Sequence, residues 1–255
     1  MLLGIDHIVV VVRDLETAMK DYARLGFTVV PGGTHPVGTH NGLIAFADGS
    51  YIELIAFYRE NREHRWWESL QKGEGLVDFC MQTDDMAADA QALRQAGVRM
   101  NAPQPWARKR PDGYELKWSL SIPQEGHRGV APFLIQDQTP RVERIPRQAS
   151  HENGAQGIGT IAVVVQDLEE VRRWYRSLLK SRGEDLDRPD LKAREMRFKV
   201  GVHALEFFAP AGPNGKVASW LEARGPAPHA ATLRGAAPGA ALDAELTHGA
   251  DLAFE

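Results

Sequence analysis

Three ionisable residues stand in or beside apolar runs of the sequence, where such groups are costly unless they have a partner or a function. They are His7, Glu53 and Asp78. An imidazole and a carboxylate suit a divalent ion such as Fe, Mn, Ni, Co or Zn, and such an ion can polarise a substrate oxygen. For Asp78, the expected counterpart is a metal, a cation or a substrate proton.

Each of these residues also has a structural alternative. A single histidine near the start of an apolar strand commonly forms hydrogen bonds in the core or at a sheet edge, and Asp78 could meet Arg13 or a backbone turn. The chemical interpretation therefore depends on whether the fold brings His7 and Glu53 together.

An internal repeat organises the elements that must position these residues. When the chain is shifted by 153 residues without a gap, one register holds from Gly4 to Ala56. The matched positions include Gly4 and Gly157, Asp14 and Asp167, Tyr22 and Tyr175, and Glu53 and Glu206. A shift of 71 residues reveals a weaker copy, in which Asp85 matches Asp14 and Asp78 matches His7.

The repeated unit has the pattern βαβββ. A β-branched run over residues 8–12 leads to Asp14, whose carboxylate can cap a helix by accepting hydrogen bonds from free backbone N–H groups. We expect that helix to run from Leu15 to Leu25, with Gly26 as its stop. Strands are expected near residues 27–30, 41–47 and 51–57, with an Asp48-Gly49 turn before the last.

This pattern predicts an α+β protein built of two pseudo-symmetric halves. The first half, residues 1–137, holds modules at about 1–60 and 75–137. A polar linker that contains prolines occupies residues 138–155. The second half, residues 156–255, holds a module at about 157–210 and an eroded module at 217–255, which is short, rich in alanine and interrupted by prolines.

With these motifs the sequence resembles the vicinal oxygen chelate superfamily, which includes glyoxalase I, extradiol dioxygenases, methylmalonyl-CoA epimerase, and fosfomycin and bleomycin resistance proteins. Asp6-His7-Ile8-Val9-Val10 is typical of the module opening, and Tyr51-Ile52-Glu53-Leu54-Ile55 is typical of its close. The run Gly32-Gly33-Thr34-His35-Pro36-Val37-Gly38-Thr39-His40-Asn41 looks like the glyoxalase-like domain subfamily. The resemblance is closest over residues 4–57 and 157–209.

The resemblance implies paired βαβββ modules whose curved mixed sheets enclose a metal or ligand pocket. In such a module the first and last strands lie side by side, and His7 and Glu53 hold their inward positions. It therefore implies His7 and Glu53 as metal ligands, and Glu53 and Asp78 as acidic groups that move a proton. His40 could supply a third ligand, but a one-residue slip of the hairpin register would turn it away.

Other residues are candidates for substrate binding. His35 and Asn41 lie in the loop and strand of the subfamily signature, although His35 could simply be exposed at a glycine-shaped turn. Trp66 could form a wall of the pocket or pack under the connecting segment.

The second half differs at the key position, because Thr160 stands where the first half has His7. Its Glu206 matches Glu53 and is either a substrate hydrogen-bond acceptor or a vestige, with His203 able to share its face. We expect one working site, in the first half.

The leading hypothesis is a metal-dependent enzyme of lyase or isomerase type that acts on a small oxygen-rich substrate. One alternative is a non-catalytic protein that sequesters a small molecule. Another is an extradiol-type dioxygenase, which needs two imidazoles and one carboxylate around iron and hence an inward His40.

Composition limits the partners. The net charge is −4, and short basic patches such as residues 108–110, expected to be a solvated loop, argue against nucleic acid. No apolar run approaches the roughly 18 residues of a membrane span. The single cysteine, Cys80, suits a reducing compartment, and the start has no basic region of a secretory signal, so we expect a cytoplasmic protein. The expected partner is a small molecule, and the expected state is a monomer or homodimer.

Overall fold

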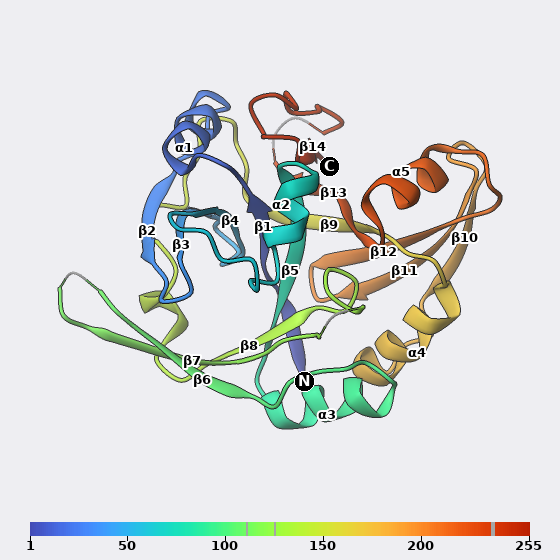
Figure 1. Ribbon diagram of the computed structural model, residues 1–255, viewed down its shortest axis with the longest axis horizontal. Helices are drawn as coiled ribbons and strands as arrows, with labels where there is room; N and C mark the ends of the chain where they lie inside the picture. Colours follow the sequence, from blue (N-terminus) through green and yellow to red (C-terminus); the bar gives the residue numbers. More distant parts are fainter. Residues whose placement is uncertain (111, 125, 236–237) are drawn as a thin grey trace.

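Two curved mixed β-sheets form the frame of the protein (Figure 1). The computed structural model describes residues 1–110, 112–124, 126–235 and 238–255. The predicted α+β fold of two halves, each with its own sheet, is confirmed.

The first sheet has the strand order β2-β3-β4-β1-β5-β8-β7-β6. Its strands are β1 (Leu2–Val11), β2 (Val30–Thr34), β3 (Thr39–Ala45), β4 (Tyr51–Phe57), β5 (Gly75–Thr83), β6 (Gln104–Lys109), β7 (Glu115–Ser121) and β8 (Phe133–Asp137).

The second sheet has the order β10-β11-β12-β9-β13-β14. Its strands are β9 (Gly157–Val164), β10 (Glu184–Arg188), β11 (Ala193–Val200), β12 (His203–Pro210), β13 (Ala227–Arg234) and β14 (Asp251–Phe254). The segment expected to be eroded thus still contributes two strands.

Helices cover the sheets at their edges and between the halves (Figure 1). They are α1 (Leu15–Arg24), α2 (Trp67–Lys72), α3 (Met86–Gln95), α4 (Leu168–Leu179) and α5 (Lys216–Arg224), with a 3-10 turn at Arg141–Glu143. Within the described residues, no helix combines the length and apolar character needed to cross a membrane.

The first helix begins where the sequence predicts. The Asp14 carboxylate accepts a hydrogen bond from the Thr17 amide at 2.7 Å, which satisfies one of the free N–H groups of the first turn. Gly26, with φ of 85°, provides the left-handed residue that ends the helix. The helix buries Leu15, Ala18 and Tyr22 against the sheet, which fixes β1 relative to the strands that follow.

The strand pairing of the two sheets repeats. In the first sheet β1 is parallel to β4 and antiparallel to β5, and in the second β9 is parallel to β12 and antiparallel to β13. The outer strand also matches, because β8 is parallel to β5 as β14 is to β13. The hairpin β6–β7 extends only the first of these two described sheets.

The halves are joined by one continuous apolar core and by two matched tyrosines. Tyr22 in α1 donates to the Thr247 carbonyl at 3.1 Å, and Tyr175 in α4 donates to the Val130 carbonyl at 3.0 Å. Both tyrosines are fully buried, and each hydroxyl reaches backbone of the other half. The equivalence seen in the sequence therefore extends to the contact between the halves.

Candidate functional site

A cavity of about 150 Å³ lies in the first half, against the sheet and the β6–β7 hairpin. Side chains alternate between the two faces of a strand, so every second residue of β3 and β4 reaches this space. Those residues are Thr39, Asn41 and Leu43 from β3, and Tyr51, Glu53 and Ile55 from β4. His7 reaches it from β1, the strand beside β4.

His7 and Glu53, expected from the sequence to share a site, do meet in this cavity. The Nε2 atom of His7 lies 3.6 Å from Oε2 of Glu53, and both residues are buried. The His7 ring stacks on the ring of Tyr51, with centroids 4.5 Å apart and an interplanar angle of 20°. This stacking fixes the plane of the imidazole ring and thus the direction from which Nε2 can contact a ligand.

The Glu53 carboxylate is fixed through its other oxygen. The Asn41 side-chain amide donates to Glu53 Oε1 at 2.6 Å, and Asn41 Oδ1 accepts from the Gly33 amide at 2.9 Å. A β-carbon at Gly32 would lie 2.1 Å from Asn41 Oδ1, so glycine is required there for the amide to fit. Glu53 Oε2 is left facing His7.

The His7 ring is oriented by Asp6. The Nδ1 atom of His7 lies 2.7 Å from Asp6 Oδ1. Burial would raise the pKa of Asp6, but the charge of Arg144 and the hydrogen bond with His7 outweigh burial and hold that pKa well below its usual range. An ionised Asp6 keeps the proton of His7 on Nδ1, which leaves the Nε2 lone pair free.

Arg144 compensates the buried Asp6 charge. Its guanidinium donates to both Asp6 oxygens, at 3.1 and 2.8 Å, and to the Tyr51 hydroxyl at 3.0 Å. It also donates to Asp137 at 2.7 Å, while Arg141 lies 3.1 Å from Asp6. Both arginines come from the segment predicted as a linker, so this segment takes part in building the site.

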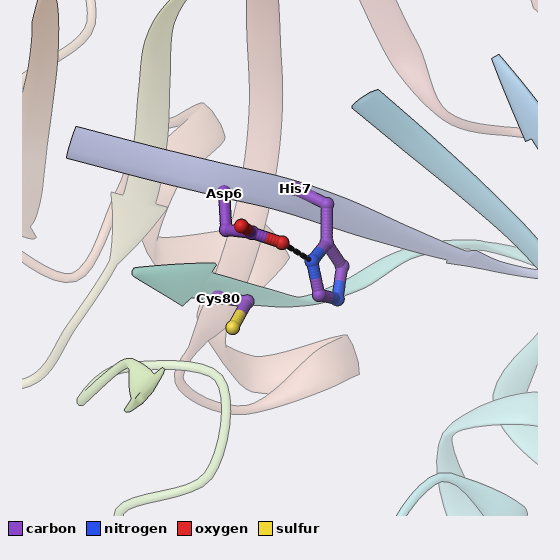
Figure 2. A group of neighbouring side chains, drawn as sticks. All are labelled: Asp6, His7 and Cys80. Carbon is purple, nitrogen blue, oxygen red and sulfur yellow. Dashed lines mark hydrogen bonds and ion pairs between the residues drawn. The ribbon is translucent and has the colours of Figure 1, made fainter. Parts of the chain in front are cut away.

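Asp6, His7 and Cys80 form the only group of three potential metal ligands with mutually close donor atoms, within 4.8 Å, in the described part of the chain. Figure 2 shows Asp6 and His7 side by side on β1, with Cys80 on β5. Both Asp6 oxygens are already bound by Arg144, however, and burial raises the pKa of the Cys80 thiol, which disfavours the metal-binding thiolate.

The pair of His7 and Glu53 fits a divalent ion better. Two ligands about 2.1 Å from one ion, at angles of 90–110°, are about 3.0–3.4 Å apart. The separation of 3.6 Å between Nε2 and Oε2 is close to this. His7 and Glu53 could therefore supply one imidazole and one carboxylate to such an ion.

The other predicted residues are distributed on both faces of β3. His35 lines the cavity; its Nδ1 lies 2.9 Å from Thr39 Oγ1, and burial lowers its pKa, which keeps the ring neutral. His40 alternates with Thr39 and Asn41, and its ring lies edge-on to Tyr58 on the opposite face. The observed register thus turns His40 away from the cavity.

Asp78 is fully buried but does not line the cavity. Its partner is Arg65 and not Arg13, and it also accepts from the Trp66 indole at 2.9 Å and the Phe79 amide at 2.9 Å. Arg65 and Trp66 do line the cavity, as the sequence suggested for Trp66. Asp78 therefore holds these two side chains in the wall.

The β6–β7 hairpin supplies residues that the sequence interpretation missed. Trp106 of β6 pairs with Trp118 of β7, and both line the cavity together with Arg108. The run at 108–110 was expected to be a solvated loop, but Arg108 is half-buried on β6 and faces inward. The alternation Trp106-Ala107-Arg108 was the signal that could have revealed this face.

In the second half, Thr160, Glu206 and His203 each have a different partner. Thr160 donates to the Glu255 carboxylate at 3.0 Å, Glu206 forms an ion pair with Arg197 at 3.0 Å, and His203 Nδ1 lies 2.8 Å from the Ile158 carbonyl. Burial and then the charge of Glu195 raise the pKa of Glu206. Glu206 and His203 do not reach the cavity of the first half.

The fold is that of the vicinal oxygen chelate superfamily. A model of the family described as glyoxalase-like domain matches residues 5–179, which is more than half of the chain. The protein therefore belongs to the glyoxalase-like domain family. Among curated proteins, no match to the sequence was found.

Solved structures share the fold. A hypothetical protein from Staphylococcus aureus gives a TM-score of 0.69 at 18% identity, with 98% of each chain covered. A mutant of 4-hydroxymandelate synthase from Streptomyces coelicolor gives 0.66 at 14% identity, with 92% of this chain and 71% of that chain covered. A xylose isomerase-like TIM barrel/4-hydroxyphenylpyruvate dioxygenase fusion protein gives 0.53 at 18%, over 92% of this chain and 36% of that one.

These identities support the shared fold and no specific activity. The superfamily includes metal-dependent epimerases and dioxygenases, and its enzymes commonly use divalent metals. The free atoms of His7 and Glu53 are compatible with that general property.

Proposed function

We propose that this protein is a metal-dependent enzyme of lyase or isomerase type, acting on a small oxygen-rich substrate in the cavity of the first half. The observation that carries the proposal is the 3.6 Å separation between His7 Nε2 and Glu53 Oε2. The other ring nitrogen of His7 is held by Asp6, and the other carboxylate oxygen of Glu53 is held by Asn41. His7 and Glu53 would hold the ion. When bound, a divalent ion stabilises negative charge that develops on substrate oxygens.

The surrounding residues prepare the site for this chemistry. Asp6 keeps the His7 tautomer and Asn41 keeps the Glu53 rotamer, so little reorganisation is needed when the ligands bind. Trp66, Trp106 and Trp118 line the cavity, and a substrate bound against them would displace water and strengthen electrostatic interactions there.

A neutral imidazole is available to accept a proton from the substrate. Burial lowers the pKa of His64 to about 4, with the charge of Arg65 adding to the effect, so its ring is neutral at physiological pH. His35 is kept neutral by burial in the same cavity. In this proposal one of these rings moves the proton, and Asp78 acts only by positioning Arg65.

Metal binding tests the proposal directly. Protein purified without chelators or a histidine tag should bind one Co²⁺ or Mn²⁺ per chain in equilibrium dialysis, and His7→Ala and Glu53→Gln should each abolish that binding while the protein stays folded. Glu206→Gln is the matched control from the second half and should bind normally. If two ions bind per chain, or if Glu206→Gln alone loses binding, the proposal has assigned the site to the wrong half.

The aromatic lining also favours a second candidate, a non-catalytic binding protein. It predicts ligand binding in the cavity without metal dependence and without exchange of substrate protons. Solvent deuterium incorporation next to the carbonyl of 2-oxo acids and 2-hydroxy aldehydes, followed by NMR with and without added metal, separates the two candidates. Metal-dependent exchange supports the enzyme, and its absence together with tight binding supports sequestration.

A further inference from the structure

Among the described residues, one cation in the cavity wall has no anionic partner. Arg65 is paired with Asp78, and Arg144 is paired with Asp6 and Asp137. For Arg108, the structure records no hydrogen bond or ion pair to any of its nitrogens across residues 1–110, 112–124, 126–235 and 238–255. Its Nε is buried and unpaired.

Leaving this guanidinium half-buried without a partner is costly. Burial lowers the pKa of Arg108, as expected for a cation that is removed from water without full compensation. The carboxylate of Glu53, in the same cavity, opposes that effect but is bound by Asn41. The cavity thus has a built position for one anionic group of a ligand.

The wall beside Arg108 is aromatic. Trp106 and Trp118 form a cross-strand pair directly beside Arg108, and Phe133 also lines the cavity. Faces of aromatic side chains pack well against a flat ring. A cavity of about 150 Å³ is large enough for a benzene-sized group, since engineered cavities of about this volume bind benzene.

We propose that the ligand of this cavity is a small aromatic carboxylate, with its carboxylate on Arg108 and its ring against Trp106 and Trp118. This deepens the proposed function, because it names the substrate class of the same site. Arg108 is a binding residue in this proposal. Its planar fork can donate two parallel hydrogen bonds to a carboxylate, which an ammonium group cannot.

The test uses three probes on full-length, chelator-treated protein, with binding followed by quenching of tryptophan fluorescence and by calorimetry. Phenylacetate carries both features, phenylacetamide lacks the charge, and acetate lacks the ring. We expect phenylacetate to bind about tenfold or more tighter than phenylacetamide, the range of a charge-assisted hydrogen bond. It should also bind tighter than acetate by a similar or larger factor.

Variants assign the preference to Arg108. Arg108→Gln should remove the difference between phenylacetate and phenylacetamide, and Arg108→Lys should keep part of it. Arg62→Gln, which changes an exposed arginine that does not line the cavity, should behave like the wild type. Retention of the full preference in Arg108→Gln would overturn the proposal.

The wild-type comparison decides the question even if a variant is unstable. Equal affinity for phenylacetate and phenylacetamide, or equal affinity for phenylacetate and acetate, contradicts the proposal. Because the probes are measured without metal, a protein that binds no ion but prefers phenylacetate through Arg108 would refute the metal enzyme and leave this inference intact.

Discussion

The two halves share six strands in the same order but differ at the positions where the first half places Asp6 and His7. The 153-residue shift puts Gly159 and Thr160 at these positions. A β-carbon at Gly159 would lie 2.3 Å from the Glu255 carboxylate, which also accepts from Thr160. In the second half, the Glu255 carboxylate therefore fills the space beside β9, and a threonine takes the place of the histidine.

The carboxylates Glu53 and Glu206 also differ in their partners. An amide, from Asn41, holds Glu53, whereas a guanidinium, from Arg197, holds Glu206. An amide leaves the negative charge available for an ion, but an arginine neutralises it. The comparison shows how one repeated frame can carry a candidate site in one half and a structural ion pair in the other.

The largest expected difference concerns the arginines of the two halves. Arg144→Met leaves Asp6 buried and without its main partner, which should lower the free energy of unfolding by about 3–5 kcal/mol. Arg197→Met removes a partner that is 39% exposed and should cost less than about 1 kcal/mol. Urea unfolding of both variants at pH 7 measures the difference.

The double variant Asp6→Asn with Arg144→Met is the control for this effect. It removes the uncompensated charge and should recover part of the lost stability. Equal losses in Arg144→Met and Arg197→Met would show that the Asp6 network is not specially important to the first half.

The matched tyrosines should differ in a smaller way. Thr247 O also accepts from the Ala250 amide, so Tyr22→Phe leaves this carbonyl with a partner and should cost about 0.5–1 kcal/mol. Val130 O has no second hydrogen bond from the described residues, so Tyr175→Phe should cost about 1–3 kcal/mol. Thermal and urea unfolding of the two variants test the order, and a larger loss in Tyr22→Phe would contradict it.

Much of this comparison could be predicted from the sequence, because the repeat and the helix caps are local patterns. The 153-residue register matched Tyr22 with Tyr175, and the family resemblance implied the inward positions of His7 and Glu53. Partners distant in sequence could not be predicted. Arg144 reaches Asp6 across 138 positions, and such pairing depends on how the linker folds over the sheet.

Strand register limited the prediction at two other places. The face of His40 depended on a hairpin whose loop did not fix the register by itself. Arg108 looked solvated because its neighbours are charged, yet its position opposite Leu116 in the β6–β7 hairpin turns it inward. In both cases the deciding information is which residue lies across the sheet.

Acid should weaken the first half through His64. A histidine whose folded pKa is lowered to about 4 favours its neutral form in the fold, so its contribution to stability is complete above the unfolded pKa near 6.5 and is lost as the pH falls towards 4. After allowance for solvent screening, the expected loss is about 1 kcal/mol between pH 7 and pH 5.

His64→Gln should remove this part of the pH dependence. His229→Gln in the second half is the matched variant, because burial also lowers the pKa of His229. Urea unfolding at pH 7, 6 and 5 gives the slopes. A wild-type slope retained in His64→Gln would mean that other groups cause the acid sensitivity.

The smallest expected effect is a gain of stability in the second half. Burial and the nearby charge of Glu195 raise the pKa of Glu206, so at pH 7 the fold holds an ionised carboxylate that it disfavours. For an acid with a raised folded pKa, stability is greatest below the unfolded value near 4.5 and falls as the pH rises through the folded value. Glu206→Gln should therefore raise the free energy of unfolding at pH 7 by about 0.5 kcal/mol, after the lost ion pair with Arg197 is subtracted, and should leave it unchanged at pH 4.

Urea unfolding of Glu206→Gln at pH 7 and pH 4 checks this prediction. A loss of stability at pH 7, or a change in metal binding, would show that Glu206 has a positive role in its half and that the contrast with Glu53 is wrong.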